Sequence, residues 1–106
     1  MNTRYRQYAR LIRTKGRLRK DAADIHAKLW GGYIFESIEM LNKAINVAME
    51  KDVAGVDVIL NFPYSDRVAM RAVAILKRMV SEKEYVISET LDTDKDSLFL
   101  TISVNW

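Results

Sequence analysis

The chain has 106 residues, 49% of them hydrophobic, which suits a single domain with a buried core and excludes wholesale disorder. It contains no cysteine, which excludes a disulfide framework and favours an intracellular, cytoplasmic setting. No apolar run reaches the roughly 18 residues that a membrane-spanning helix needs, so we expect no membrane partner. The N-terminus also lacks the apolar core of a signal peptide.

The formal net charge of +3 combines two regions of opposite charge. Residues 1–20 contain eight Lys or Arg and no Asp or Glu, which gives +8. The rest of the chain holds the other nine basic side chains and all fourteen acidic ones, so its net charge is −5. This asymmetry is typical of a protein with a charged partner. We therefore divide the chain into a basic N-terminal helical arm, 1–20, and a single α+β domain, 21–106.

Apolar spacing predicts a helix over residues 2–15, because Tyr5, Tyr8 and Ile12 recur at i, i+3 and i+7. The same helical register stacks four guanidinium groups in one stripe: Arg6, Arg10, Arg13 and Arg17. Like charges on one helical face repel each other, so an anionic partner would stabilise this helix.

Glycines divide the helical part of the sequence. Gly16 predicts an interruption, after which apolar spacing indicates a second helix over about 18–30. The two glycines of "WGG" at 30–32 predict a sharp turn. A long apolar stripe then predicts a third helix over 33–52, with Gly55 as a left-handed cap just past its end.

The helical spacing of apolar residues ends before "VDVILNF", residues 56–62. This short stretch is β-branched and apolar, which predicts a largely buried strand that ends at Pro63. A helix over 66–82 follows. We expect Ser65 to be its N-cap and Asp66 to lie against the positive end of its dipole.

Two more strands are predicted at 84–91 and 98–104, joined by the polar hairpin "DTDKDS". A strand–helix–strand crossover makes the first two strands parallel, and the third runs antiparallel to the second. We expect the third strand to be central because its alternate residues are the most consistently apolar. The predicted fold class is α+β: a small three-stranded mixed sheet packed by two amphipathic helices, 33–52 and 66–82, with an N-terminal basic helical segment.

Motifs for catalysis or metal binding are weak. His26 is the only histidine, so no site with several imidazole ligands can form, and a structural or surface role is favoured. The alternate aspartates of "DTDKDS" at 92–97 begin like a calcium loop. Ser97 and Ser103 stand where that loop needs Gly and Glu, so a solvated hairpin connection is favoured.

Three carboxylates on or beside strands, Asp57, Glu84 and Glu89, have the residue types of a metal-dependent nuclease. Nothing in their spacing makes them converge, and Asp57 is expected to point away from the core because it alternates with valines. No phosphate-binding glycine loop or nucleophile motif is present. We therefore expect no enzyme, no catalytic residues, no metal and no cofactor.

The basic arm carries the functional prediction. Arginine binds phosphate with bidentate geometry, and tyrosines between arginines can stack on the bases of single strands. We therefore expect an accessory or regulatory protein that binds DNA or RNA mainly through backbone phosphates. The candidate nucleic-acid-binding residues are Arg4, Arg6, Arg10, Arg13, Lys15, Arg17, Arg19 and Lys20, with Tyr5 and Tyr8 as candidates for stacking.

Other interpretations of the arm remain open. The arm can be a solvated helical face that packs its tyrosines on the body. An organelle targeting peptide is less favoured because serine is absent from the first 36 residues, and the apolar side of the helix is thin for a membrane anchor.

The main alternative is a small protein–protein interaction module, an adaptor or a phage-type viral inhibitor that docks its basic arm on an acidic surface of a larger protein. An open strand edge can also pair with another chain or form a homodimer. Trp30 and Trp106 are candidate apolar anchors, although core packing is the more frequent role of tryptophan.

Overall fold

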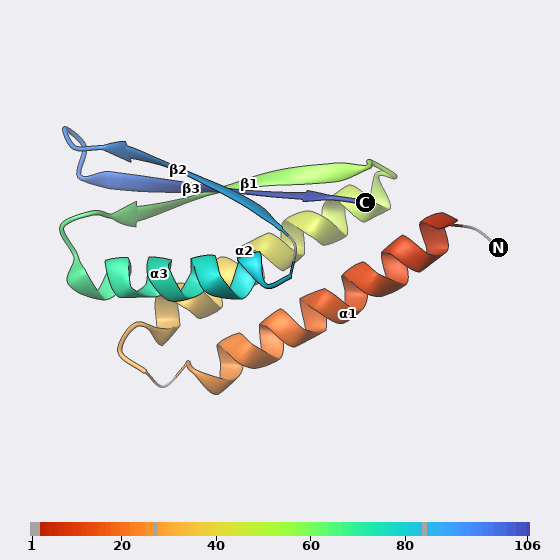
Figure 1. The fold of residues 1–106 in the computed structure, drawn as a ribbon, viewed down its shortest axis with the longest axis horizontal. Coiled ribbons are helices and arrows are strands. Elements are labelled where there is room, and N and C mark those ends of the chain that lie inside the picture. Colours follow the sequence, from red (N-terminus) through yellow and green to blue (C-terminus); the bar gives the residue numbers. More distant parts are fainter. Residues whose placement is uncertain (1–2, 27, 84) are drawn as a thin grey trace.

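The structure is a computed structural model that describes residues 3–26, 28–83 and 85–106, with the backbone alone for residues 3–6. It confirms the α+β fold class. Figure 1 shows the elements in chain order: α1 (Thr3–Asp24), α2 (Gly31–Glu50), β1 (Gly55–Pro63), α3 (Arg67–Ser81), β2 (Val86–Asp92) and β3 (Ser97–Asn105).

The three strands form one sheet in the order β1-β3-β2, so the prediction of a central third strand is confirmed. Both ladders are antiparallel, with Val58 opposite Ile102 and Ile102 opposite Ile87. The sheet is therefore antiparallel rather than mixed: β1 and β2 run in the same direction, as their crossover requires, but β3 separates them. Four inward residues of β3 are all buried, which explains its central place: Leu98, Leu100, Ile102 and Val104.

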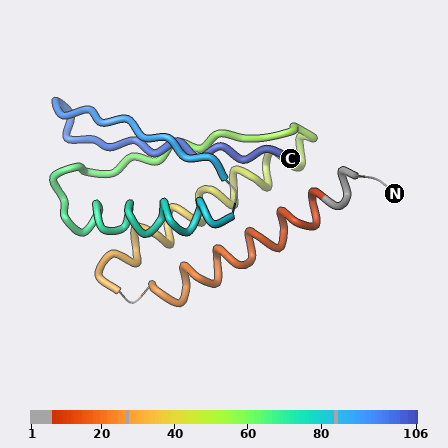
Figure 2. The backbone as a smooth tube through the Cα atoms, in the orientation of Figure 1, coloured from red at the N-terminus to blue at the C-terminus, as the bar shows by residue number. Residues whose placement is uncertain are grey.

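The helices lie along one face of the sheet (Figure 1). The helices α2 and α3 pack against the sheet, and α1 packs against α2. One hydrophobic core joins the layers, and α1 contributes Leu11, Leu18 and Ala22 to it. The red part of α1 lies at the end of the molecule where β3 finishes (Figure 2). The predicted basic arm is thus packed on the body.

The predicted helix break at Gly16 and the separate helix over 18–30 are wrong, because α1 runs without interruption from Thr3 to Asp24. Gly16 costs about 1 kcal/mol in a helix. Burying Leu18 on the same face as Leu11 contributes roughly 1.5–3 kcal/mol, so packing outweighs the glycine. The predicted boundary between residues 20 and 21 lies inside this helix.

The turn predicted at 30–32 lies earlier in the chain, between Asp24 and Gly31, because both glycines belong to α2, which begins at Gly31. The backbone of Gly31 lies against the preceding turn: a Cβ atom here would be 2.6 Å from the carbonyl oxygen of His26 and would overlap that of Ile25. A glycine is required at this position because two backbone segments are in contact there.

The helix α2 ends in a Schellman motif, in which Val53 N–H donates to Ala48 O and Asp52 N–H donates to Met49 O. The left-handed residue is Asp52, with φ of 59°, so the prediction of a left-handed Gly55 is wrong. Gly55 instead allows close strand pairing, since a Cβ atom there would be 2.8 Å from the carbonyl oxygen of Val104.

The N-cap of α3 is Asp66 and not Ser65, one residue later than predicted. Asp66 Oδ1 accepts hydrogen bonds from Val68 N–H (2.8 Å) and Ala69 N–H (3.2 Å). Ser65 is bound elsewhere: its N–H and Oγ donate to the two carboxylate oxygens of Asp96, at 2.8 and 2.6 Å.

Candidate nucleic-acid interface

The helix α1 has a buried side and a basic side. Leu11 and Leu18 anchor it in the core, seven residues apart. On the other side four cationic residues are exposed: Arg10, Arg13, Arg17 and Lys20. The structure thus brings the three described members of the predicted arginine stripe to one exposed face of a helix that is held by packing.

A groove of about 390 Å³ runs beside this face, between α1 and the end of α3. Its lining holds four cations, Arg10, Arg13 and Arg17 from α1 and Lys83 from the turn after α3, against one carboxylate, Glu82. Lys83 did not appear among the predicted site residues, because no spacing along the sequence links it to the stripe.

Toward the C-terminal end of α1 the groove between the two helices continues with a different charge. A hollow of about 650 Å³ is lined there by Asp21 and Asp24 of α1 and by Arg71 and Arg78 of α3. The guanidinium carbon of Arg71 lies 4.9 Å from the centroid of the Trp30 ring, a cation–π contact. The charges balance at this end, so the positive surface is concentrated around Arg10, Arg13, Arg17 and Lys83.

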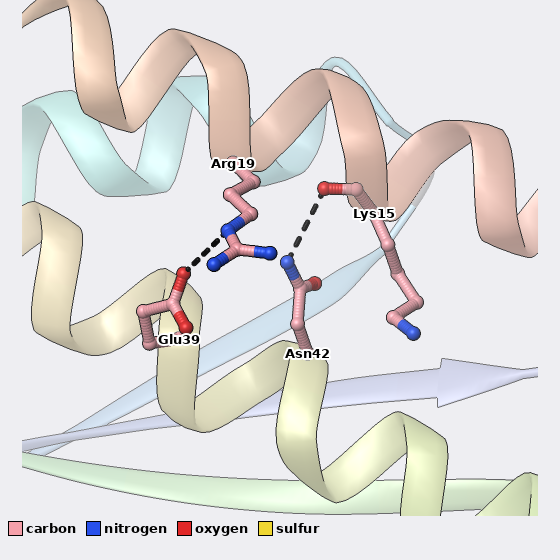
Figure 3. Close-up of polar contacts among 4 residues, drawn as sticks. All are labelled: Lys15, Arg19, Glu39 and Asn42. Atoms are coloured by element: carbon pink, nitrogen blue, oxygen red, sulfur yellow. Dashed lines mark hydrogen bonds and ion pairs between the residues drawn. The ribbon is translucent and has the colours of Figure 1, made fainter.

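Two of the predicted cations instead face α2. Arg19 Nε lies 3.0 Å from Glu39 Oε1 and forms an ion pair with it. The geometry of this pair is not that of a hydrogen bond, and Glu39 Oε1 accepts none among the described residues. Lys15 Nζ donates to Asn46 Oδ1, and burial lowers the pKa of Lys15. Asn42 Nδ2 donates to the backbone carbonyl of Lys15 at 3.2 Å, as Figure 3 shows together with the Arg19 pair. Lys15 and Arg19 therefore link the two helices.

Tyr8 is half-buried, and its hydroxyl donates to Asp52 Oδ1 at 3.0 Å. This bond ties α1 to the left-handed residue that follows the end of α2. A role of Tyr8 in base stacking stays a prediction. The side chains of Arg4, Tyr5 and Arg6 lie outside the described part of the structure, so their predicted contacts stay predictions as well.

A small cavity of about 170 Å³ lies at the other end of the basic groove and shares Arg10 and Lys83 with it. Tyr85 and Trp106 line this cavity, and Tyr85 Oη and Trp106 Nε1 are both buried with no hydrogen-bond partner among the described residues. Burial raises the pKa of Tyr85 to about 12. The phenol is therefore held in its neutral form.

The other candidate residues lie apart. The exposed ring of His26 meets the ring of Phe35 edge-on, with centroids 4.9 Å apart. Asp57 is exposed on β1, as predicted from its alternation with valines, and Glu89 Oε1 accepts from Lys77 Nζ at 2.9 Å. Glu84 lies outside the described residues. Within the described ranges no group of three His, Cys, Asp or Glu side chains is placed to hold a metal ion.

Comparison of the chain with protein-family models, with curated proteins and with solved structures finds no match. Every helix in the described residues lacks the length or the apolar character that crossing a membrane requires.

Proposed function

We propose that this protein is a non-enzymatic accessory or regulatory protein that binds nucleic acid through phosphate contacts on the exposed face of α1. The observation that carries the proposal is the cluster of Arg10, Arg13 and Arg17 on one exposed helical face, with Lys83 on the opposite wall of the groove. Arginine side chains are suited to phosphate because the guanidinium fork can donate two hydrogen bonds at once.

The dimensions favour a short contact. From Arg10 to Arg17 the helix rises about 10 Å, at about 1.5 Å per residue. Three to four phosphate contacts would give a slope of log K against log salt of roughly −3 on duplex DNA. Because phosphates carry no sequence information, we expect weak sequence preference. The absence of cysteine supports a cytoplasmic setting for this role.

The test is fluorescence anisotropy of labelled single- and double-stranded oligonucleotides at two salt concentrations. The test variant is R13Q/R17Q/K83Q, which leaves Arg10 in place because Arg10 makes a further interaction in the fold. The matched control K28Q/R67Q/K95Q removes the same charge from exposed residues that do not line the basic groove. Deleting residues 1–20 is not a usable control, since it would remove Leu11 and Leu18 from the core.

We expect the test variant to lose at least tenfold in affinity and to show a shallower salt slope, while the control keeps most of the affinity of the wild-type protein. Equal loss in the two variants would reduce the effect to net charge and would contradict a specific interface. The absence of binding by the wild-type protein at low salt would reject the proposal.

The same arginines would also suit an acidic surface of a larger protein, as an adaptor or an inhibitor of phage type would use them. Salt dependence does not separate the two functions, because both are electrostatic. A competition experiment does separate them. Free DNA or RNA displaces the protein from an acidic partner only if the nucleic acid binds the same face of α1.

A further inference from the structure

The strand β1 is an open edge of the sheet. It pairs with β3 on one side, and within the described residues no strand pairs with its other side. Alternate N–H and C=O groups along an edge strand point outward and can pair with another chain. Edge strands are usually protected by lysine, proline or bulges. Over Gly55–Pro63 the only charged residue is Asp57, the proline stands at the far end, and Ile59 is 63% exposed.

An apolar groove of about 590 Å³ lies beside the start of this edge, between β1 and α2. Met40 and Val47 project from α2, Val53 comes from the segment that leads into β1, and Val56 comes from β1 itself. Met40 and Val53 are 54% and 46% exposed, although both are apolar. An apolar groove next to an open strand edge is the arrangement that proteins use to bind an extended peptide as an added strand.

The charges on the rim indicate what kind of peptide fits. The charged residues that line the groove are both lysines, Lys43 and Lys51. In a symmetric dimer formed through this surface, each lysine pair would face its own copy, which disfavours self-association. Acidic side chains on a partner would instead complement both lysines.

We propose that the β1 edge and the α2 groove bind an extended segment of a partner protein in which acidic residues flank an apolar one. Lys43 and Lys51 are about 12 Å apart along α2, at about 1.5 Å per residue. Residues i and i+4 of a strand are about 13 Å apart and point to the same face. The fitting pattern is therefore an acidic residue at i, a large apolar residue at i+2 and an acidic residue at i+4. This inference does not rest on the proposed function, because it uses a different surface.

The probe is the synthetic peptide TSETLTEST, with TSKTLTKST and TSETSTEST as controls for charge and for the apolar anchor. Binding is measured by amide chemical-shift titration of the full chain. We expect TSETLTEST to shift amides of residues 53–59 and 40–51, and each control peptide to bind at least tenfold more weakly. The variant K43E/K51E should reverse the preference and select TSKTLTKST, a result that loss of folding cannot produce.

Several outcomes would overturn the proposal. One is equal binding of the acidic and basic peptides. Another is shifts confined to the arginine face of α1, with loss of binding in R13Q/R17Q/K83Q, which would mean that the peptide acts only as a polyanion. A third is sedimentation showing that the protein is a dimer whose β1 amides are already protected from exchange. Retained peptide binding in R13Q/R17Q/K83Q, whether or not that variant binds DNA, would separate this surface from the proposed nucleic-acid interface.

Discussion

The side-chain amide of Asn42 on α2 donates a hydrogen bond of 3.2 Å to the backbone carbonyl of Lys15, in the middle of α1. Asn42 is only 9% exposed, and its Oδ1 atom is buried without a partner among the described residues. A buried polar contact of this kind fixes how two helices lie against each other, and here it sets the position of the basic face relative to the body.

Replacement of Asn42 tests this contact. We expect Asn42→Ala to lower the free energy of unfolding by about 1–2 kcal/mol, because a buried hydrogen bond is lost. Both variants remove the unpaired oxygen, and Asn42→Leu should cost less because its side chain also refills the space. Urea denaturation measures both values. A larger loss for leucine than for alanine would contradict this account of the contact.

Gly16 in α1 and Gly31 in α2 should respond in opposite directions to alanine. Gly31→Ala places a Cβ atom against the backbone of residues 25 and 26, and we expect a loss of about 1–3 kcal/mol from this overlap. At Gly16 the Cβ position has no atom within 4 Å, so Gly16→Ala should gain about 0.5–1 kcal/mol from helix propensity. Thermal denaturation measures both effects. A shift of the melting temperature in the same direction in both variants would contradict the backbone contact at Gly31 or the open space at Gly16.

Acid stability should depend on the cap of α3. The backbone N–H of Ala69, the hydroxyl of Tyr33 and the backbone N–H of Val68 lower the pKa of Asp66 below its ordinary value of 3.8. A depressed pKa means that the folded state favours the carboxylate, so this stabilisation is complete above pH 3.8 and is lost as the pH falls through the folded-state pKa. We expect Asp66→Asn to flatten the dependence of the unfolding free energy on pH in this acid range. Asp57→Asn, on the exposed face of β1, serves as the control and should leave the dependence in place.

Alkaline stability should depend on Tyr85. Burial raises its pKa from 10.0 to about 12, so the folded state keeps the phenol neutral after the unfolded chain has ionised it. The contribution of Tyr85 is complete below pH 10.0 and decreases as the pH rises toward 12. Tyr85→Phe should therefore weaken the loss of unfolding free energy in this range. Tyrosinate absorbance should lose its latest-titrating component, and an unchanged titration curve would contradict the burial of this hydroxyl.

Much of the fold could be predicted from the sequence, because apolar periodicity reports burial directly. The alternation in "LFLTISV" placed the third strand at the centre of the sheet, and the stripe in α2 marked its buried face. The errors arose at single residues where local preference competes with packing. Gly16 favours a helix break, but Leu18 gains more by continuing the face that begins at Leu11. Asp52 rather than Gly55 adopts the left-handed conformation, because the helix ends at Glu50 and not at residue 52 as predicted.

The candidate site was predictable only in part. The spacing of Arg10, Arg13 and Arg17 placed them on one face, since all three belong to a single helix. Lys83 joins them only because α1 lies beside the end of α3, and no local pattern specifies that arrangement. The packing roles of Lys15 and Tyr8 depend on partners that are more than thirty positions away in the sequence. Lys15 bonds to Asn46 of α2, and Tyr8 bonds to Asp52 in the turn after α2.

The central position of β3 also constrains the order of events during synthesis. Both neighbours of β3 precede it in the chain, and neither pairs with the other. While β3 is still inside the ribosomal exit tunnel, β1 and β2 have no strand to pair with, and the apolar faces of the helices have no sheet to cover. Residues 97–105 must emerge before any ladder can close, so the nascent chain remains a set of unpaired segments until then. Chaperone binding to ribosome-stalled chains that end before residue 97 should accordingly exceed binding to residues 1–106 carried out of the tunnel by an added C-terminal linker.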